Sequence, residues 1–146
     1  MSLTVNREGR LLTLTLDRPD QGNRLDSATL QGLEAALADA NGPDGPDVVV
    51  LAAAGPDFCL GREPSALPVT PANLEAEFGL IQRVNELVQN ATFVTIAAVQ
   101  GRAVGAGLSL AGRCDLVIAA EDAVLSFPEI PHGVPPTIVL SHYAFA

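Results

Sequence analysis

Hydrophobic and polar residues alternate near the start of the chain, and this pattern predicts a β-hairpin. Every second residue of Leu12–Leu16 is apolar, as in a strand with one buried face. We expect this strand to pair with Leu3–Arg7 across the turn Glu8-Gly9-Arg10. A loop rich in Pro, Gly and Asn, residues 17–23, then separates the hairpin from the next element.

Apolar residues recur at helical spacing in two later segments. We expect the first helix after Asp26 or Ser27, either of which can cap it, and the second after the cap and first-turn pair Thr70 and Pro71. The apolar stripe of the first helix comprises Leu30, Leu33, Leu37 and Ala40. The stripe of the second comprises Leu74, Phe78, Ile81, Val84 and Val88. Both stripes are predicted to lie in the core.

Short, continuously apolar segments alternate with these helices. Val48–Ala53 follows the breaker-rich loop 41–47 and is typical of a buried parallel strand, and Thr95–Val99 has the same character. Two further short strands are expected at Leu116–Ala119 and Val124–Phe127. The alternation of strands and helices predicts an α/β fold with covered sheets.

Length and composition place these elements in one globular domain, residues 1–146. The hydrophobic content of 48% is sufficient for a core. No apolar run approaches the length of a membrane span, and the N-terminus lacks a basic region followed by an apolar one, so we expect neither membrane insertion nor export. Cys59 and Cys114 lack the spacing of a metal site or a disulfide framework. This cysteine usage favours buried thiols, no metal site and a cytoplasmic location.

The charge of the chain restricts its partners. A net charge of −9 argues against a protein that holds nucleic acid by neutralising phosphates. All eight basic residues are arginines, and four of them lie near loops with candidate chemistry: Arg18, Arg24, Arg62 and Arg102. Each is either ordinary surface charge or a local contact for an anionic ligand.

The stretch from Thr95 to Gly112 carries the clearest candidate site. The pattern predicts a strand, a turn containing Gly101, Gly105 and Gly107, and then a helix. Glycine allows backbone conformations that bring N–H groups close to a ligand, and the first N–H groups of a helix have no partner within it. Such a corner suits a developing negative charge, although the same glycines would also permit close packing alone.

Three known glycine motifs were compared with this corner. A phosphate-binding P-loop needs Lys and Ser/Thr after its last glycine, but Leu108 follows Gly107. The dinucleotide motif is matched at only two of its glycines, Gly105 and Gly107. The sequence Gly107-Leu-Ser109-Leu-Ala111 is close to a nucleophile elbow, so a serine hydrolase with Ser109 as nucleophile and His132 or His142 as base is an alternative.

Seven short motifs, in order along nearly the whole chain, resemble the crotonase superfamily of enoyl-CoA hydratases and isomerases. They are Asp17-Arg-Pro, Asn23-Arg-Leu, Val48-Val-Val-Leu-Ala, Phe58-Cys-Leu-Gly61, the segment from Ala97 to Gly107, Cys114-Asp115-Leu and Phe127-Pro-Glu-Ile130. The resemblance implies a spiral of repeated β-β-α units, in which two loops converge on a substrate thioester. It also implies that the chain ends before the C-terminal helices of the family.

The resemblance assigns the thioester-binding groups by motif position. The backbone N–H groups of Arg62 and Ala106 would form the oxyanion hole, and the substrate-binding positions would be Gly61, Arg24, Gly105 and Gly107. The family usually has Gly-Ala-Asp where this chain has Gly61-Arg62-Glu63, which keeps the backbone donor and adds bulk and charge.

The resemblance also assigns the proton chemistry. Glu129, which lies between Phe127-Pro128 and Ile130-Pro131, would be the general acid/base, and a partly desolvated carboxyl with a raised pKa suits that role. Ser109 stands where two-carboxylate hydratases carry a second glutamate. One carboxylate is sufficient for a shuttle that moves a double bond.

The partner that these assignments imply is an acyl-CoA thioester, with no separate cofactor. The family resemblance further implies a homo-oligomer, either a trimer or a dimer of trimers. Because family members continue well beyond the position of Ala146, a catalytically impaired fragment or a structural or binding member of an assembly is the non-enzymatic alternative.

Overall fold

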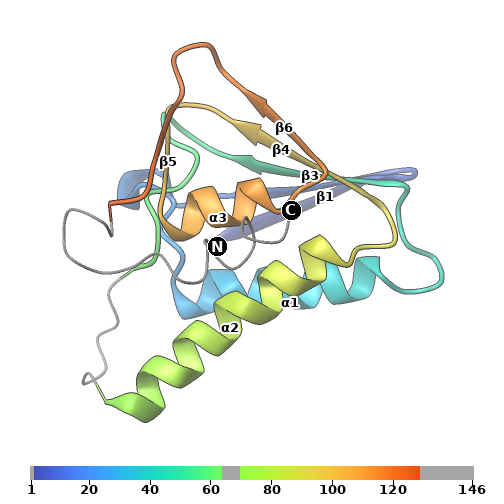
Figure 1. The fold of residues 1–146 in the computed structure, drawn as a ribbon. Helices are drawn as coiled ribbons and strands as arrows, with labels where there is room; N and C mark the ends of the chain where they lie inside the picture. The colour runs from blue at the N-terminus through green and yellow to red at the C-terminus, as the bar shows by residue number, and fades with distance from the viewer. Residues whose placement is uncertain (1, 64–69, 129–146) are drawn as a thin grey trace.

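The computed structural model describes residues 2–63 and 70–128 (Figure 1). Five strands form one sheet in the order β1-β2-β3-β4-β6. Their bounds are Leu3–Glu8 for β1, Leu11–Leu16 for β2, Val48–Ala53 for β3, Val94–Val99 for β4 and Leu116–Ala119 for β6. The β1–β2 pair is the predicted antiparallel hairpin, with Leu3 opposite Leu16, and every other neighbouring pair in this sheet is parallel.

The helices cover one face of this sheet. Their bounds are Ser27–Ala40 for α1, Pro71–Gln89 for α2 and Ala106–Gly112 for α3, and a short 3-10 helix, η1, spans Pro19–Gln21. Figure 1 shows all three α-helices on the same side of the five strands. Alternate residues of β2 and β4 are buried, as a sheet with one covered face requires. The predicted α/β fold is therefore confirmed.

Both predicted helix starts have the expected caps. The carboxylate of Asp26 accepts a hydrogen bond from the Thr29 N–H at 2.7 Å, and the Thr70 hydroxyl accepts one from the Asn73 N–H at 3.2 Å. Pro71 occupies the first turn of α2, where its missing N–H costs no hydrogen bond. These local signals explain why both helices begin where the sequence predicts.

The core is built from the predicted stripe of α1 and from only part of that of α2. All four residues of the α1 stripe are buried, as are Ile81, Val84 and Val88 of α2. The prediction was wrong for Phe78, which is 40% exposed, and for Leu74, which is half-buried. The reason is geometric, because the first turns of α2 extend away from the sheet (Figure 1). The regular spacing of apolar residues therefore extends into the first turns of α2, which do not pack against the sheet.

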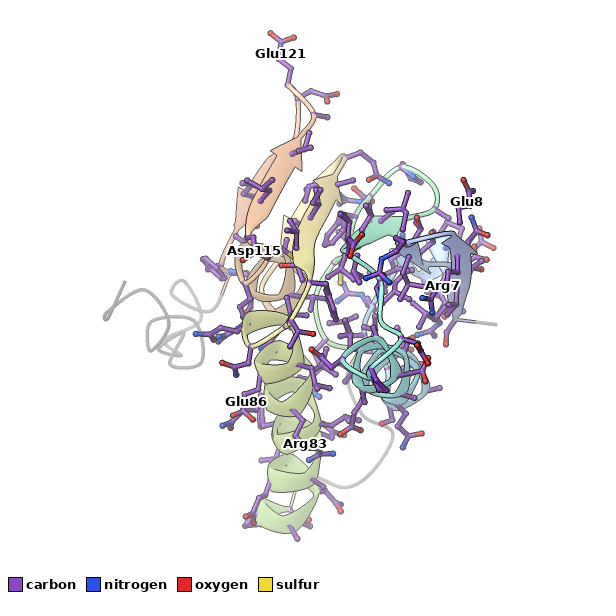
Figure 2. The ribbon with its side chains drawn as sticks, turned by 90° about the vertical axis from the view of Figure 1, so that its right-hand side faces the viewer. Arg7, Glu8, Arg83, Glu86, Asp115 and Glu121 are labelled. Carbon is purple, nitrogen blue, oxygen red and sulfur yellow. The ribbon has the colours of Figure 1, made fainter. Side chains whose placement is uncertain are left out.

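A second, two-stranded parallel sheet pairs β5 with β7 and was not predicted in full. Strand β5, Arg102–Val104, lies within the segment interpreted as a turn, and β7 spans Val124–Ser126. The predicted strand Val124–Phe127 is therefore one residue longer than β7. Between β6 and β7 the chain forms a projecting tip that carries Glu121 (Figure 2).

Side chains fasten the main elements together (Figure 2). Arg83 of α2 forms an ion pair with Glu34 of α1, with 2.6 Å between Nε and Oε1. Asp115, just before β6, accepts hydrogen bonds from both the N–H and the hydroxyl of Thr95 at 2.7 and 2.8 Å. These hydrogen bonds hold the pKa of the Asp115 carboxyl below its ordinary value. Within residues 2–63 and 70–128, no helix has the length and apolar character needed to cross a membrane.

Candidate functional site

The loop after β3 passes between two other segments of the chain and hydrogen-bonds to both. On one side, the Leu60 N–H donates to the Gly22 carbonyl at 2.9 Å. On the other, the Cys59 N–H donates to the Arg102 carbonyl at 3.1 Å, and the Val104 N–H donates to the Cys59 carbonyl at 2.9 Å. The loop is thereby held as the middle segment of three that are joined by backbone hydrogen bonds.

The same pattern continues one segment further. The Gly105 N–H donates to the Ser126 carbonyl at 2.9 Å, and the Val124 N–H donates to the Gly101 carbonyl at 2.8 Å. We refer to the four hydrogen-bonded segments, residues 22–25, 59–62, 101–105 and 124–126, as the cross-turn ladder. Its order in space follows its order in the sequence, so equivalent points of successive chain turns lie side by side.

The ladder determines the direction of the Arg62 N–H. Leu25 and Arg62 form a parallel bridge, in which the Leu25 N–H donates to the Gly61 carbonyl at 2.9 Å and the Leu25 carbonyl accepts from the Glu63 N–H at 3.0 Å. In a parallel bridge, one residue of the pair makes both hydrogen bonds, and here that residue is Leu25. The N–H and the carbonyl of Arg62 therefore point to the opposite side. Within residues 2–63 and 70–128, the Arg62 N–H has no hydrogen-bond acceptor.

The second candidate donor, the Ala106 N–H, lies close to the first. Ala106 is the first residue of α3, and its N–H has no acceptor among the residues that the structure describes. A Cβ placed on Gly61 would lie 3.9 Å from the Ala106 nitrogen and 3.1 Å from the Val104 carbonyl oxygen. The two loops therefore converge, and the predicted site positions 61, 62, 105 and 106 are brought together.

Two glycines permit this convergence. Gly61 has a φ of +94° and Gly105 a φ of +54°, which are values that side-chain-bearing residues rarely adopt. Gly107 has another role, because a Cβ there would come within 2.6 Å of the Cys59 carbonyl oxygen. The predicted substrate-binding role of Gly107 stays a prediction, and its place in the structure is a close contact between α3 and the loop after β3.

Ser109 and the proposed proton carrier are placed very differently. Ser109 is buried in the first turn of α3, with 5% of its surface exposed, and its N–H donates to the Gly105 carbonyl at 2.9 Å. Glu129, His132 and His142 lie outside the described residues. The catalytic assignment of Glu129 and the serine hydrolase alternative therefore stay predictions, although the burial of Ser109 is unfavourable for a nucleophile that must meet a substrate.

The side chains of Arg62 and Arg24 are both engaged with the protein. The Arg62 guanidinium pairs with Glu77 of α2 at 2.8 Å and lies 5.6 Å from the centre of the Phe78 ring. It thus extends toward α2, whereas the bridge with Leu25 fixes its backbone. Arg24 donates to the Leu60 carbonyl at 2.9 Å, so its guanidinium lies beside the loop after β3.

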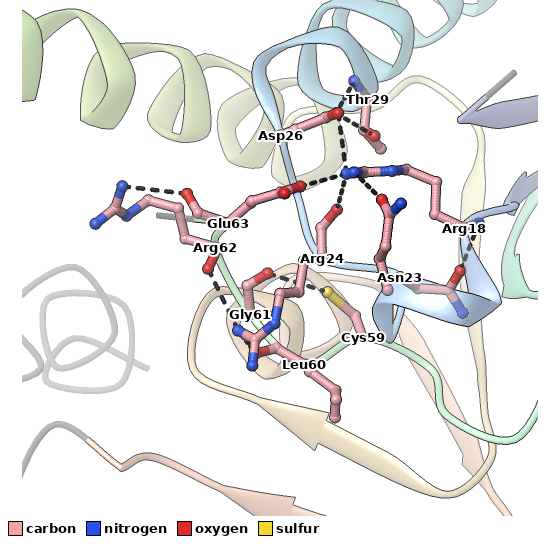
Figure 3. A network of polar contacts seen from close by, with 11 residues as sticks. Arg18, Asn23, Arg24, Asp26, Thr29, Cys59, Leu60, Gly61, Arg62 and Glu63 are labelled. Atoms are coloured by element: carbon pink, nitrogen blue, oxygen red, sulfur yellow. Dashed lines mark hydrogen bonds and ion pairs between the residues drawn. The ribbon is translucent and has the colours of Figure 1, made fainter. Parts of the chain in front are cut away.

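A polar network behind this loop was missed by the sequence reasoning (Figure 3). One nitrogen of Arg18, Nη1, reaches Glu63 at 2.6 Å, Asp26 at 2.9 Å and the Arg24 carbonyl at 3.1 Å. Burial acts to raise the pKa of the Asp26 carboxyl, but hydrogen bonds from Thr29 and the charge of Arg18 outweigh it and hold that pKa below its ordinary value. The only available signal was the presence of Asp17-Arg-Pro and Asn23-Arg-Leu among the family motifs.

Asn23 and Asp57 complete the support of the loop. Asn23 has a φ of +50°, and its side-chain amide donates to the carbonyls of Ala54 and Asp57, each at 2.8 Å. The Asp57 carboxylate accepts two bonds from the Arg102 guanidinium, at 2.8 and 2.7 Å, and one from the Arg102 N–H at 3.0 Å. The hydrogen bonds from Arg102 outweigh burial and hold the pKa of Asp57 below its ordinary value.

Comparisons with known proteins show which family this chain is similar to. A sequence model of the family Enoyl-CoA hydratase/isomerase matches residues 6–144. A probable enoyl-CoA hydratase of Rhizobium meliloti and the 2,3-dehydroadipyl-CoA hydratase of Escherichia coli are each 35% identical over 92% of this chain, which covers 52% of either relative. The solved enoyl-CoA hydratase of Mycobacterium smegmatis superposes with a TM-score of 0.89 at 34% identity, over 97% of this chain and 58% of its own.

A second solved structure extends the agreement in fold. The crotonase-like protein of Legionella pneumophila has a TM-score of 0.91 at 26% identity and covers 99% of this chain. The chain spans about half the length of the curated relatives that it matches. Its repeated β-β-α units, its converging loops and its sequence identify it as a member of the enoyl-CoA hydratase/isomerase family, with the crotonase fold.

Proposed function

We propose that this chain carries the oxyanion hole of an acyl-CoA thioester hydratase or isomerase, formed by the backbone N–H groups of Arg62 and Ala106. The observation that supports it is the convergence of the two loops, with the Ala106 nitrogen 3.9 Å from a Cβ placed on Gly61. Both N–H groups are without an acceptor in the described part of the chain. Two such donors on one thioester oxygen stabilise the negative charge that develops there in an enolate.

Glu129 is the proposed general acid/base. In an isomerase, its carboxylate would take a proton from C2 of a 3-enoyl thioester, and the electron pair would delocalise through C1 to the thioester oxygen and through C3 to C4. Return of the proton at C4 would give the conjugated 2-enoyl thioester. A single carboxylate completes this cycle, because the proton that it removes is the proton that it returns.

Ser109 favours the isomerase within this proposal. The position that carries a second glutamate in two-carboxylate hydratases holds a serine here, and this serine is 5% exposed. A hydroxyl is a weak base at neutral pH without an activating partner, so addition of water between two carboxylates has no second carboxylate at this place. Hydration by Glu129 with another group is the alternative within the same family.

The proposed partner is an acyl-CoA thioester, which brings the coenzyme as part of the substrate. Arg24 lies beside the loop that carries Gly61 and is the proposed local contact for the anionic part of that ligand. We extend the proposal to a homo-oligomer, a trimer or a dimer of trimers, located in the cytoplasm. Light scattering on the intact protein would measure the assembly state.

Replacement of Glu129 by Gln tests the proton-transfer role. We expect turnover of 3-enoyl-CoA or 2-enoyl-CoA to fall by about two to four orders of magnitude, with little change in thioester binding. Ser109→Ala is the matched comparison and should leave isomerisation largely intact. Turnover of Glu129→Gln equal to that of the wild type would refute the assigned role, and labelling by a serine-directed phosphonate that Ser109→Ala abolishes would instead support the hydrolase.

A further inference from the structure

The residue that follows the first proposed donor is held by an arginine from a distant part of the chain. Nη1 of Arg18 contacts the Glu63 carboxylate at 2.6 Å, and the two residues are 45 positions apart in the sequence. The same nitrogen donates to the Arg24 carbonyl at 3.1 Å. Arg24 precedes Leu25, and Glu63 follows Arg62, so the guanidinium spans both strands of the bridge that directs the Arg62 N–H (Figure 3).

Arg18 is itself held rigidly. Its N–H donates to the Asn23 side-chain oxygen at 2.8 Å, and its carbonyl accepts from the Asn23 N–H at 3.0 Å. A further guanidinium nitrogen donates to the side-chain oxygen of Gln21. The Arg18 side chain is only 17% exposed. The turn from Arg18 to Asn23 and these contacts therefore hold the Arg18 side chain in one position.

We propose that Arg18 is a positioning residue for the thioester-oxygen donor at Arg62. It acts through Glu63 and the Arg24 carbonyl, which fix the peptide groups on either side of the bridge, and this role needs no contact with substrate. This inference rests on the proposed oxyanion hole. It goes beyond that proposal because it assigns a role to a charged group that lies outside the two converging loops.

A guanidinium suits these contacts because two of its nitrogens are used, Nη1 toward Glu63 and the Arg24 carbonyl and Nη2 toward Gln21. Arg18 also has a second carboxylate partner, Asp26, with an oxygen 2.9 Å from Nη1. The planar fork of arginine meets several acceptors in fixed directions, whereas a lysine ammonium is a compact charge on a flexible stem. We therefore expect Arg18→Lys to keep the charge balance of the site and still lose part of the alignment.

The decisive measurement is the carbonyl stretch of a bound thioester labelled with carbon-13 at C1, recorded in a Glu129→Gln background so that the ligand is not turned over. Hydrogen bonds from an oxyanion hole lower this frequency relative to the ligand in water. We expect the downward shift in the parent protein to shrink in Arg18→Gln and in Glu63→Gln. In otherwise wild-type protein, the same substitutions should lower kcat by about ten- to a hundredfold with a smaller change in KM.

Arg83→Gln is the matched control, because it breaks the ion pair with Glu34, also 2.6 Å long, between α1 and α2. It should affect the melting temperature without changing kcat or the carbonyl frequency. Arg18→Gln and Glu63→Gln should also be non-additive in kcat when combined, since they remove the same contact. If Arg18→Gln does not fold, Glu63→Gln alone decides the matter.

The outcomes separate this inference from the proposed function. If the parent protein itself shows no lowered carbonyl frequency, the oxyanion hole is refuted and the positioning role falls with it. If the parent shows the shift, and Arg18→Gln and Glu63→Gln keep it together with wild-type kcat, the oxyanion hole stands and the positioning role of Arg18 is wrong. A fall in melting temperature with unchanged kcat would likewise show that Arg18 is only structural.

Discussion

Gly107 and Cys59 are in such close contact that no side chain fits between them. A Cβ on Gly107 would come within 2.6 Å of both the Cβ and the carbonyl oxygen of Cys59, and within 2.7 Å of its Sγ. Two of these three atoms belong to a side chain that is fully buried, and the third belongs to the backbone. Because residue 107 has no side chain, the start of α3 can pack directly against the loop after β3.

We expect Gly107→Ala to lower the free energy of unfolding by about 1–3 kcal/mol, because the backbone must shift to admit the methyl group. The matched control is Gly79→Ala in α2, where the nearest atom to an added Cβ is the end of the Arg83 side chain at 3.5 Å. Alanine is the better helix former, so this control should be neutral or slightly stabilising. Urea unfolding of both variants measures the difference, and equal stability of the two would contradict the packing argument.

The adjacent positions 61 and 62 should differ greatly in how much stability and turnover they lose on replacement by alanine. Gly61→Ala places a side chain at a φ of +94° and 3.1 Å from the Val104 carbonyl, so we expect a cost of about 1–3 kcal/mol and loss of thioester turnover. Arg62→Ala keeps its backbone N–H and loses the pair with Glu77, which is worth up to about 1 kcal/mol. Turnover of Arg62→Ala should therefore stay within about tenfold of the wild type. Comparable losses in both variants would show that the Arg62 side chain is itself required.

Acid should weaken the link between the loop after β3 and strand β5. Hydrogen bonding from Arg102 holds the pKa of Asp57 below its unfolded value of about 3.9. The folded carboxyl therefore binds a proton less readily than the unfolded one, so its stabilising effect is complete above that value and is lost as the pH falls below it. The stability difference between the wild type and Asp57→Asn should shrink as the pH is lowered through this range. A stability difference that does not change with pH would contradict this linkage. Glu121→Gln, which changes a carboxylate at the projecting tip, serves as the control.

Both thiols should be inert while the chain is folded. Burial raises the pKa of Cys59 to about 11 and that of Cys114 to about 12, because the thiolate is poorly solvated in an apolar environment. We expect no alkylation by iodoacetamide near pH 8 in native buffer and double alkylation in denaturant, as measured by intact mass. Rapid labelling of one thiol in native buffer would identify a local opening of the structure.

Local signals in the sequence were sufficient for much of the fold. The alternation in Leu12–Leu16 and the caps at Asp26 and Thr70 act between near neighbours, so the hairpin and both long helices could be located directly. Strand β5 could not be recognised, because three residues show no periodicity and its partner β7 is distant in sequence. The exposure of Phe78 was likewise hidden, since spacing alone does not show where a helix leaves the sheet.

The candidate site could be located from the sequence only in part. Family motifs placed Gly61 and Ala106 in the site, and the structure brings them together. Motif order contained no information on the side-chain contacts of Arg18 or Arg62, because Glu63 is 45 positions from Arg18 and Glu77 is 15 positions from Arg62. Such contacts depend on how the turns of the chain are stacked, and a single sequence does not record that.

The cross-turn ladder has a consequence for how the chain folds. Among the described residues, the backbone hydrogen bonds that join the four segments run only between neighbours in the ladder, as between the repeats of a solenoid. Stability in such an array is transmitted from neighbour to neighbour, so a defect in one layer weakens adjacent layers first. Residues 59–62 and 101–105 occupy the interior of this array, with a layer on either side. Amide hydrogen exchange should therefore be slower at the hydrogen-bonded N–H groups of these two inner segments, those of Cys59 and Val104, than at those of the outer layers, and the inner segments hold the peptide units next to the two proposed donors.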